Sequence, residues 1–322
     1  MTRKRFNRFS NGLLIFLIII SVAAIIYVLQ VKEEQPVIKE NKRETKQIEP
    51  QKSITPQALK SKPAKEKTSA SIPIEKKEKK KIVVSKIEKM PLPLRQVAII
   101  IDDIGYDLVS VKELLKVNAD ITYSVLPFLI HSREAAEMLH KANKEILLHL
   151  PMEPVSYPRE KPGSGALFTD MNNEELVFQL EKDIEAVPYI VGVNNHMGSK
   201  FMEDKEKLTL IFSKLKKKNL FFIDSRTAAN SEAFAAAQKV GLPVAARKIF
   251  LDNNRDYNEI YNNLLNISKN NGDVSPLIVI GHPYPETIRA IKDATRVLRE
   301  KGILIVPVSQ IIKAKAALGG FS

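Results

Sequence analysis

The chain has 322 residues, with 50 Lys and Arg against 37 Asp and Glu, a formal net charge of +13, and no cysteine. The lack of cysteine excludes disulfides, thiol nucleophiles and thiolate metal sites. Residues 1–95 hold 22 basic and 9 acidic residues, which leaves 28 of each in residues 96–322. Because the remainder of the chain is neutral, the basic total does not indicate a nucleic-acid-binding protein.

Residues 13–31 predict a single transmembrane anchor. They form an uncharged apolar run of about 19 residues after the basic segment MTRKRFNRFSNG, residues 1–12, and this run is long enough to cross a bilayer core as a helix. A cleaved signal peptide is the alternative, but KEEQP follows the run directly where a small-residue cleavage site is expected. The basic tail predicts a cytoplasmic amino end in the cytoplasmic membrane, with the rest of the chain outside the cytoplasm, periplasmic or extracellular.

Residues 32–95 predict a disordered linker. This stretch is rich in Lys, Glu, Pro, Gln and Ser and has only scattered apolar residues, so it cannot bury enough apolar surface to offset the entropy of ordering. Its run EKKEKKK, Glu75–Lys81, is interpreted as a solvated part of the linker. Contact with an anionic envelope surface is the alternative for this run.

From residue 96 onwards, apolar runs alternate with amphipathic segments. We expect strands at 97–101, 121–126, 145–150, 190–195, 220–224, 242–246, 276–281 and 303–308. We expect helices at 110–117, 132–142, 173–187, 205–218, 230–240, 257–269 and 285–301. This alternation predicts an α/β fold with a parallel sheet covered by helices. The length favours a closed or nearly closed barrel of seven to eight strands over an open sheet, although periodicity alone does not separate the two.

Polar residues follow several of these strands, and the carboxyl ends of parallel strands meet at one face. In VAIIIDDIGYD, two adjacent aspartates end an apolar strand, and two neighbouring carboxylates need hydrogen-bond donors or a cation to offset their repulsion. The strand-end residues are Asp102 and Asp103; His149, with Glu153 four residues on; Asn194, Asn195 and His196; Asp224, Ser225 and Arg226; and His282.

One Asp and two His are a sufficient ligand set for Zn²⁺ or a similar ion with one position left open for water. A single strand-end His has an ordinary structural explanation, but several on one predicted face favour a metal site. One aspartate would then bind the ion while its neighbour acts as a base. His131 and His140, on or beside a predicted helix, are interpreted as surface or helix-packing residues.

Five segments in this order, IDDIG, HLPMEP, GVNNHMGS, FIDSRT and GHPYPET, resemble the divergent polysaccharide deacetylase family, a branch of the NodB-type deacetylases. The resemblance covers nearly all of residues 96–322 and implies a distorted (β/α) barrel. It also implies that Asp102 is the catalytic base and that Asp103 binds a divalent metal, with zinc the expected ion. The late histidine that serves as the general acid corresponds to His282, which Asp224 would orient.

The sequence departs from the NodB pattern at the second metal histidine. That spacing gives His149 and Glu153, so we expect His196 to complete a site with Asp103 and His149. Glu153 would be a substitute ligand or a neighbour of the ligands, and Asn195 a possible additional site residue. The Arg-Pro-Tyr loop and the tryptophan of the NodB enzymes have no match.

Two functions therefore remain open. The first is a membrane-anchored, metal-dependent carbohydrate deacetylase that acts on an acetylated envelope polysaccharide or a peptidoglycan-type glycan. The second is a non-catalytic deacetylase-fold protein that binds glycan or an envelope partner.

Overall fold

The computed structural model describes residues 95–269 and 274–317 of the chain. The predicted cytoplasmic tail, the membrane anchor and the linker up to residue 94 lie outside these ranges. Within the described ranges, no helix has both the length and the apolar character that crossing a membrane requires.

A single parallel sheet forms the centre of the fold. In the described residues it has nine strands, in the order β6-β5-β4-β3-β2-β1-β8-β7, and β9 pairs with the first residues of β1. The strands are β1 (Arg95–Ile104), β2 (Thr122–Val125), β3 (Glu145–Met152), β4 (Gly192–Met197), β5 (Phe221–Asp224), β6 (Val244–Ala246), β7 (Ile249–Phe250), β8 (Leu277–Gly281) and β9 (Ile303–Ile305). The predicted parallel sheet is confirmed. All eight expected strands occur, and the additional strand is β7, whose two residues are too few to show a periodic pattern.

The two ends of the sheet are bridged by one segment, residues 244–250. Its first part, β6, pairs with β5, and its last part, β7, pairs with β8 at the opposite end. Between them, the Arg247 N–H donates to the Asp224 carbonyl and the Lys248 N–H donates to the Ile278 carbonyl, each at 2.9 Å. A segment bonded to both ends requires a strongly curled sheet, which brings the carboxyl ends of distant strands around a common centre.

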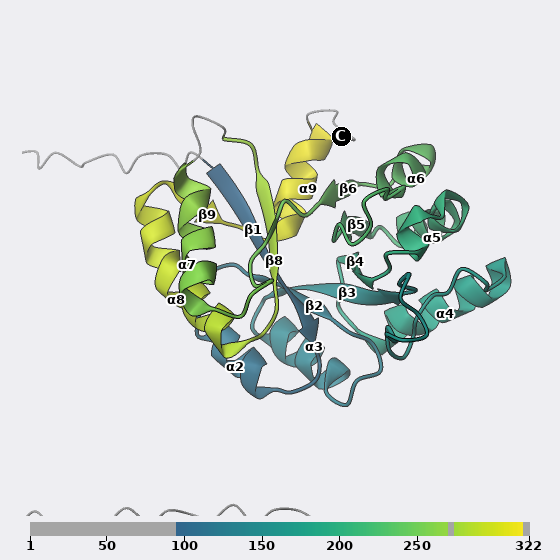
Figure 1. Ribbon diagram of the computed structural model, residues 1–322, viewed down its shortest axis with the longest axis horizontal. Coiled ribbons are helices and arrows are strands. Elements are labelled where there is room, and N and C mark those ends of the chain that lie inside the picture. The colour runs from purple at the N-terminus through teal and green to yellow at the C-terminus, as the bar shows by residue number, and fades with distance from the viewer. Residues whose placement is uncertain (1–94, 270–273, 318–322) are drawn as a thin grey trace, which may run out of the picture. The chain divides into compact units, whose positions relative to one another are not determined.

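In the described ranges, α2 to α8 lie on the outside of the curled sheet (Figure 1). They are α2 (Val109–Leu115), α3 (Ser132–Lys141), α4 (Asn173–Ala186), α5 (Lys205–Lys217), α6 (Ala233–Val240), α7 (Tyr257–Asn266) and α8 (Pro285–Glu300). Short 3₁₀ turns occur at Phe201–Glu203 and Ile267–Lys269. The predicted start of α4 is confirmed, because Asn172 and Glu175 form a reciprocal capping box there.

Successive side chains of the strands point to opposite faces of the sheet and pack into two different hydrophobic cores. Ile99 and Ile101 of β1 pack on the side covered by the outer helices, whereas Ala98 and Ile100 face the inside of the curl. The inner core is completed by α9 (Val308–Ala317), whose Val308 N–H donates to the Thr122 hydroxyl at the start of β2. This helix therefore fills the inside of the curl near the amino ends of the strands.

The C-terminal segment corrects one expected element. The predicted strand 303–308 ends at Ile305, and Val308 begins α9 instead. Pro307, immediately before Val308, explains the change, because proline is favoured at helix starts and cannot donate to a sheet.

Candidate functional site

The two adjacent aspartates at the end of β1 face the same side of the sheet because the strand is irregular there. In a regular strand, successive side chains point to opposite faces. Here Asp103 adopts φ 57°, and the register against β2 shifts between Ile101 and Ile104. Aspartate tolerates this left-handed conformation better than β-branched residues do. As a result, His149 Nε2 lies 3.6 Å from Asp102 Oδ2 and 3.2 Å from Asp103 Oδ1.

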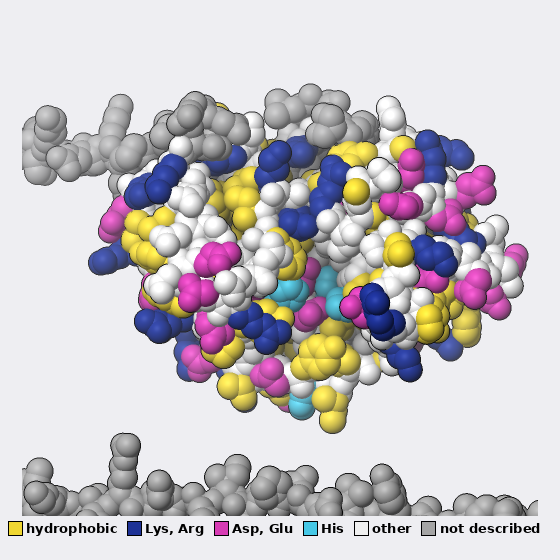
Figure 2. All heavy atoms as spheres, viewed as in Figure 1, with side chains coloured by type: hydrophobic (Ala, Val, Ile, Leu, Met, Phe, Trp, Pro, Cys, Tyr) yellow, Lys and Arg dark blue, Asp and Glu magenta, His cyan; other side chains and the backbone are white. Residues whose placement is uncertain are grey.

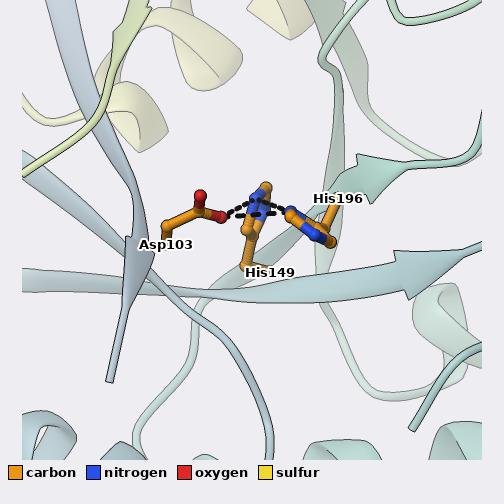
Figure 3. A group of neighbouring side chains, drawn as sticks. All are labelled: Asp103, His149 and His196. Carbon is orange, nitrogen blue, oxygen red and sulfur yellow. Dashed lines mark hydrogen bonds and ion pairs between the residues drawn. The ribbon is translucent and has the colours of Figure 1, made fainter. Parts of the chain in front are cut away.

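Strands β3 and β4 supply the two histidines beside Asp103. His149 is the direct cross-strand partner of Asn194, and His196 lies two residues further along β4, on the same face. Three ligand-type atoms meet (Figure 3): His149 Nε2 and His196 Nδ1 lie 3.2 and 3.0 Å from Asp103 Oδ1, and 3.1 Å from each other.

This triangle suits a divalent cation. Ligand atoms about 2.0–2.2 Å from a tetrahedral Zn²⁺ lie about 3.3–3.6 Å apart, a few tenths of an ångström more than the three separations here. Asp103 Oδ1 is buried, and among the described residues it receives no well-directed hydrogen bond. A buried carboxylate oxygen with two imidazole nitrogens at contact distance therefore fits a metal ligand better than an ordinary hydrogen-bond acceptor. In the described part of the chain, Asp103, His149 and His196 are the residues whose spacing suits a metal ion.

His282 follows β8 and borders the same group. Its Nε2 lies 3.8 Å from Asp103 Oδ2. Its Nδ1 lies 3.0 Å from Asp252 Oδ1, while Asp252 Oδ2 accepts hydrogen bonds from the His282 backbone N–H at 2.6 Å and from the Thr287 hydroxyl at 2.8 Å. Asp252 therefore fixes the orientation of the His282 ring, with Nε2 directed toward the aspartates.

The expectation that Asp224 orients His282 is wrong. The buried carboxylate of Asp224 accepts hydrogen bonds from the Arg226 N–H at 2.7 Å and the Ser231 hydroxyl at 2.8 Å, so it holds the loop after β5. Asp252 was not predicted as a site residue because the strand before it, β7, is too short to show a periodic pattern. An acidic residue directly after the apolar letters IFL was the available signal.

Two further predicted site residues also lie outside the triangle. Glu153 accepts hydrogen bonds from the Thr169 backbone N–H and hydroxyl at 2.7 and 2.6 Å, and from Lys200 at 2.8 Å. Both of its oxygens are thus used, and it does not replace the missing second histidine. Asn195 accepts a hydrogen bond from the Ser225 N–H at 2.9 Å and joins the ends of β4 and β5. Neither residue belongs to the group that suits a metal ion.

Asn194 connects the histidine side of the site with the Asp102 side. Its amide donates to Asp102 Oδ1 at 2.8 Å and to the Ser225 hydroxyl at 3.3 Å. Its carbonyl oxygen lies 2.9 Å from His149 Nδ1 and accepts a short hydrogen bond from the Ser124 hydroxyl. Ser124 was not predicted as a site residue, because Thr122 and Tyr123 of the same strand also carry hydroxyls and nothing in the sequence distinguishes Ser124 from them.

The electrostatic environment separates the two aspartates. Burial raises the pKa of Asp102 above its ordinary value. Burial alone would also raise the pKa of Asp103, but the His149 and His196 rings hold it well below its usual range. Burial opposes protonation of His282, yet its hydrogen bond with Asp252 and the nearby aspartate charges raise its pKa overall. One carboxylate is therefore a stronger base than usual, the other stays ionised, and His282 retains a proton more readily than a free imidazole.

The site opens to solvent on one side. The side chains of Asp103, His196 and His282 are 24%, 21% and 18% exposed, whereas those of Asp102 and His149 are only 4% and 2% exposed. Histidine and acidic side chains meet near the middle of the face shown in Figure 2, among hydrophobic and basic side chains. An external molecule can therefore reach the triangle and His282, while Asp102 lies beneath them.

Comparison with solved structures supports the fold. Protein ATU2773 from Agrobacterium tumefaciens C58 superposes with a TM-score of 0.63 at 23% sequence identity, over 67% of this chain and 89% of that chain. At this level of identity, the similarity shows that the two proteins share a fold and nothing more.

Comparison of the sequence identifies relatives and a family. YibQ of Escherichia coli (strain K12), an uncharacterized protein, is 36% identical over 206 residues, which span 63% of each chain and thus less than two thirds of YibQ. A protein of Haemophilus influenzae (strain ATCC 51907 / DSM 11121 / KW20 / Rd) is 30% identical over 208 residues, 64% of this chain and 72% of its own. Residues 99–312 match the sequence profile described as divergent polysaccharide deacetylase. This match covers most of the chain and all of the residues in the site, and the chain belongs to the divergent polysaccharide deacetylase family.

Proposed function

We propose that this protein is a metal-dependent carbohydrate deacetylase that removes acetyl groups from an envelope polysaccharide or a peptidoglycan-type glycan. The observation that carries the proposal is the triangle of Asp103, His149 and His196, with Asp102 on one side and His282 on the other. Acetyl hydrolysis needs a polarised carbonyl, a base for water and an acid for the leaving group. Chemically suitable groups for all three tasks occur within this site.

The divided roles follow from the contacts. A divalent cation held by Asp103, His149 and His196 would polarise the acetyl carbonyl and make water more acidic. Asp102, whose pKa is raised by burial, accepts the proton of the attacking water. His282 donates a proton from Nε2 to the departing amine or alcohol, while Asp252 accepts its Nδ1–H and keeps the ring in place.

The proposed location follows from the predicted anchor. With residues 13–31 in the cytoplasmic membrane and the amino end in the cytoplasm, the deacetylase domain would lie outside the cytoplasm, where envelope glycans are found. The predicted linker of residues 32–95 would let the domain reach glycan at a distance from the membrane.

Metal content and acetate release, measured on the same preparations, test the proposal. We expect about one Zn²⁺ or similar ion per full-length chain by elemental mass spectrometry, and loss of that ion in His149→Ala and His196→Ala. Asp102→Asn should retain the ion but lower acetate release from an acetylated glycan about 10²–10⁴-fold, the usual contribution of a general base.

His140→Ala is the matched control because it removes an imidazole that lies outside the site and stacks on Tyr189. It should change neither metal content nor acetate release. A folded wild-type protein that binds no divalent metal would disprove the hydrolase. Metal and glycan binding without acetate release, in Asp102→Asn and wild type alike, would instead support the non-catalytic glycan-binding function.

A further inference from the structure

The side-chain amide of Asn194 is completely buried and touches both halves of the site. An amide has two N–H donors and an oxygen with two lone pairs. All four capacities of Asn194 are used, by Asp102 and Ser225 on the nitrogen and by His149 and Ser124 on the oxygen. A fully satisfied buried amide cannot rotate without breaking several hydrogen bonds.

The orientation of this amide follows from chemistry. Rotating it by 180° would place its oxygen against the Asp102 carboxylate, 2.8 Å away in the present arrangement, where two acceptors would repel each other. The carboxylate therefore fixes the amide nitrogen toward Asp102 and the oxygen toward His149 Nδ1, 2.9 Å away. Because that oxygen accepts, His149 must carry a hydrogen on Nδ1.

The position of this hydrogen determines which His149 nitrogen can bind a metal ion. With Nδ1 protonated, a neutral imidazole has its free lone pair on Nε2. Nε2 is the atom that faces Asp103 and His196. Metal-binding histidines commonly donate their second ring N–H to a carboxylate or a carbonyl in this way. Here the acceptor is an amide that simultaneously donates to Asp102.

We propose that Asn194 is a positioning residue that holds His149 in its metal-binding tautomer and Asp102 in its orientation, and so joins the metal ligands to the base through a single side chain. This inference rests on the proposed function, because it assigns a role within the same site. It goes further in predicting that mutation can separate the two functions of the amide, its oxygen as acceptor for His149 and its nitrogen as donor to Asp102.

Two substitutions separate these halves. Asn194→Ala removes both the acceptor for His149 and the donor to Asp102, so divalent metal affinity should fall about 10–100-fold, as is typical when a partner of a metal ligand is lost. Asn194→Asp retains an oxygen acceptor for His149 but places a second carboxylate against Asp102, which it repels. Its metal affinity should stay within about threefold of wild type, while acetate release falls about 100-fold or more through the misplaced base.

Thr227→Val is the control for a local structural defect. It removes the hydrogen bond that the Asn195 amide donates to the Thr227 hydroxyl and the one that this hydroxyl donates to the Met197 carbonyl. Neither bond involves His149 or Asp102. We expect wild-type metal affinity for this variant. Zn²⁺ titration calorimetry of the full-length wild type and the three variants gives the affinities.

Nitrogen-15 NMR of the histidine-labelled protein gives a second readout that does not need metal or activity. The chain has five histidines, so the ring signals can be assigned with single His→Ala variants. In the metal-free wild type, the neutral form of His149 should show a protonated Nδ1 and an unprotonated Nε2, because Nδ1 donates to the Asn194 oxygen. Asn194→Ala should lose the preference for protonated Nδ1.

The outcomes distinguish this inference from the proposed function. Equal metal affinity in wild type and Asn194→Ala, with an unchanged His149 tautomer, would overturn the role of Asn194 and leave the metal site standing. Absence of metal binding in the wild type would overturn the proposed function. The His149 tautomer in the two proteins would then decide the positioning role by itself.

Discussion

Asp183 is a buried carboxyl group outside the site whose surroundings favour its protonated form. It lies on the inner face of α4 with no exposed surface. Gln179 donates to one carboxylate oxygen at 2.9 Å, but the other oxygen has no hydrogen-bond partner among the described residues. Burial accordingly raises the pKa of Asp183 to about 8 from an ordinary value of 3.8.

We predict that Asp183 weakens folding as the pH rises. The unfolded chain loses its proton near pH 3.8 and the folded chain only near pH 8, so the stability supplied by the protonated group is fully present below the lower value. It is lost as the pH rises toward the upper value, at up to about 1.4 kcal/mol per pH unit. Urea unfolding of wild type and Asp183→Asn at pH 5, 6.5 and 8 should show a gap that grows with pH in favour of the variant. A constant gap would show that Asp183 has an ordinary pKa.

Single residues also show what the sequence could predict about the site. Asp103, His149 and His196 could be placed together because parallel strands end at one face. The left-handed turn at Asp103, which puts two adjacent carboxylates on the same side, has no signal in the letters DD. Asp252 replaced Asp224 as the partner of His282 because a contact between distant loops depends on how the sheet curls, which periodicity does not encode.

Among the elements, α9 contributes to stability from inside the curled sheet. Ile311 of this helix is completely buried in the inner core. We predict that Ile311→Ala lowers the free energy of unfolding by about 2–5 kcal/mol, because a buried cavity is left that surrounding strands cannot close. Urea denaturation followed by circular dichroism measures the change.

Ile130→Ala provides the comparison, since this side chain is 86% exposed and its removal should change stability by no more than about 0.5 kcal/mol. Equal effects of the two substitutions would mean that α9 is not packed against the inner core. A larger effect for Ile130 would imply that its side chain is covered by a contact with another molecule.

The elements that sequence analysis missed share a physical cause. β7 has two residues, too few for an alternating pattern to appear, and α9 follows the predicted strand β9 after only Val306 and Pro307. An apolar run that passes from a strand into a helix looks like one strand when both elements are buried. Longer strands and helices with one polar face were predicted correctly, because their periodicity reflects a covered and an uncovered side.

For the whole molecule, we predict that binding of a metal ion raises the melting temperature. The candidate ligands come from β1, β3 and β4, which are brought together only in the folded chain, so an ion that binds them stabilises the folded state alone. At 100 times the dissociation constant, the stabilisation is about 2.7 kcal/mol, which corresponds to roughly 5–10 °C in a domain of this size. Differential scanning fluorimetry with Zn²⁺ and then with a chelator measures this shift.

The variants His149→Ala and His196→Ala should melt at the same temperature with and without Zn²⁺. If they shift as much as the wild type, the ion binds somewhere other than the triangle. If none of the proteins shifts, the site does not bind Zn²⁺ at the tested concentration, and other divalent ions should be compared in the same assay.

The bridging segment at residues 244–250 also has a consequence for association between copies of the chain. A free sheet edge presents a row of unpaired N–H and C=O groups to which another molecule's strand can add, a common route to aggregation. Here the two terminal strands have only three and two residues and belong to one segment that already bonds both ends of the sheet. The described domain therefore offers little template at these two ends of the sheet for edge-to-edge addition.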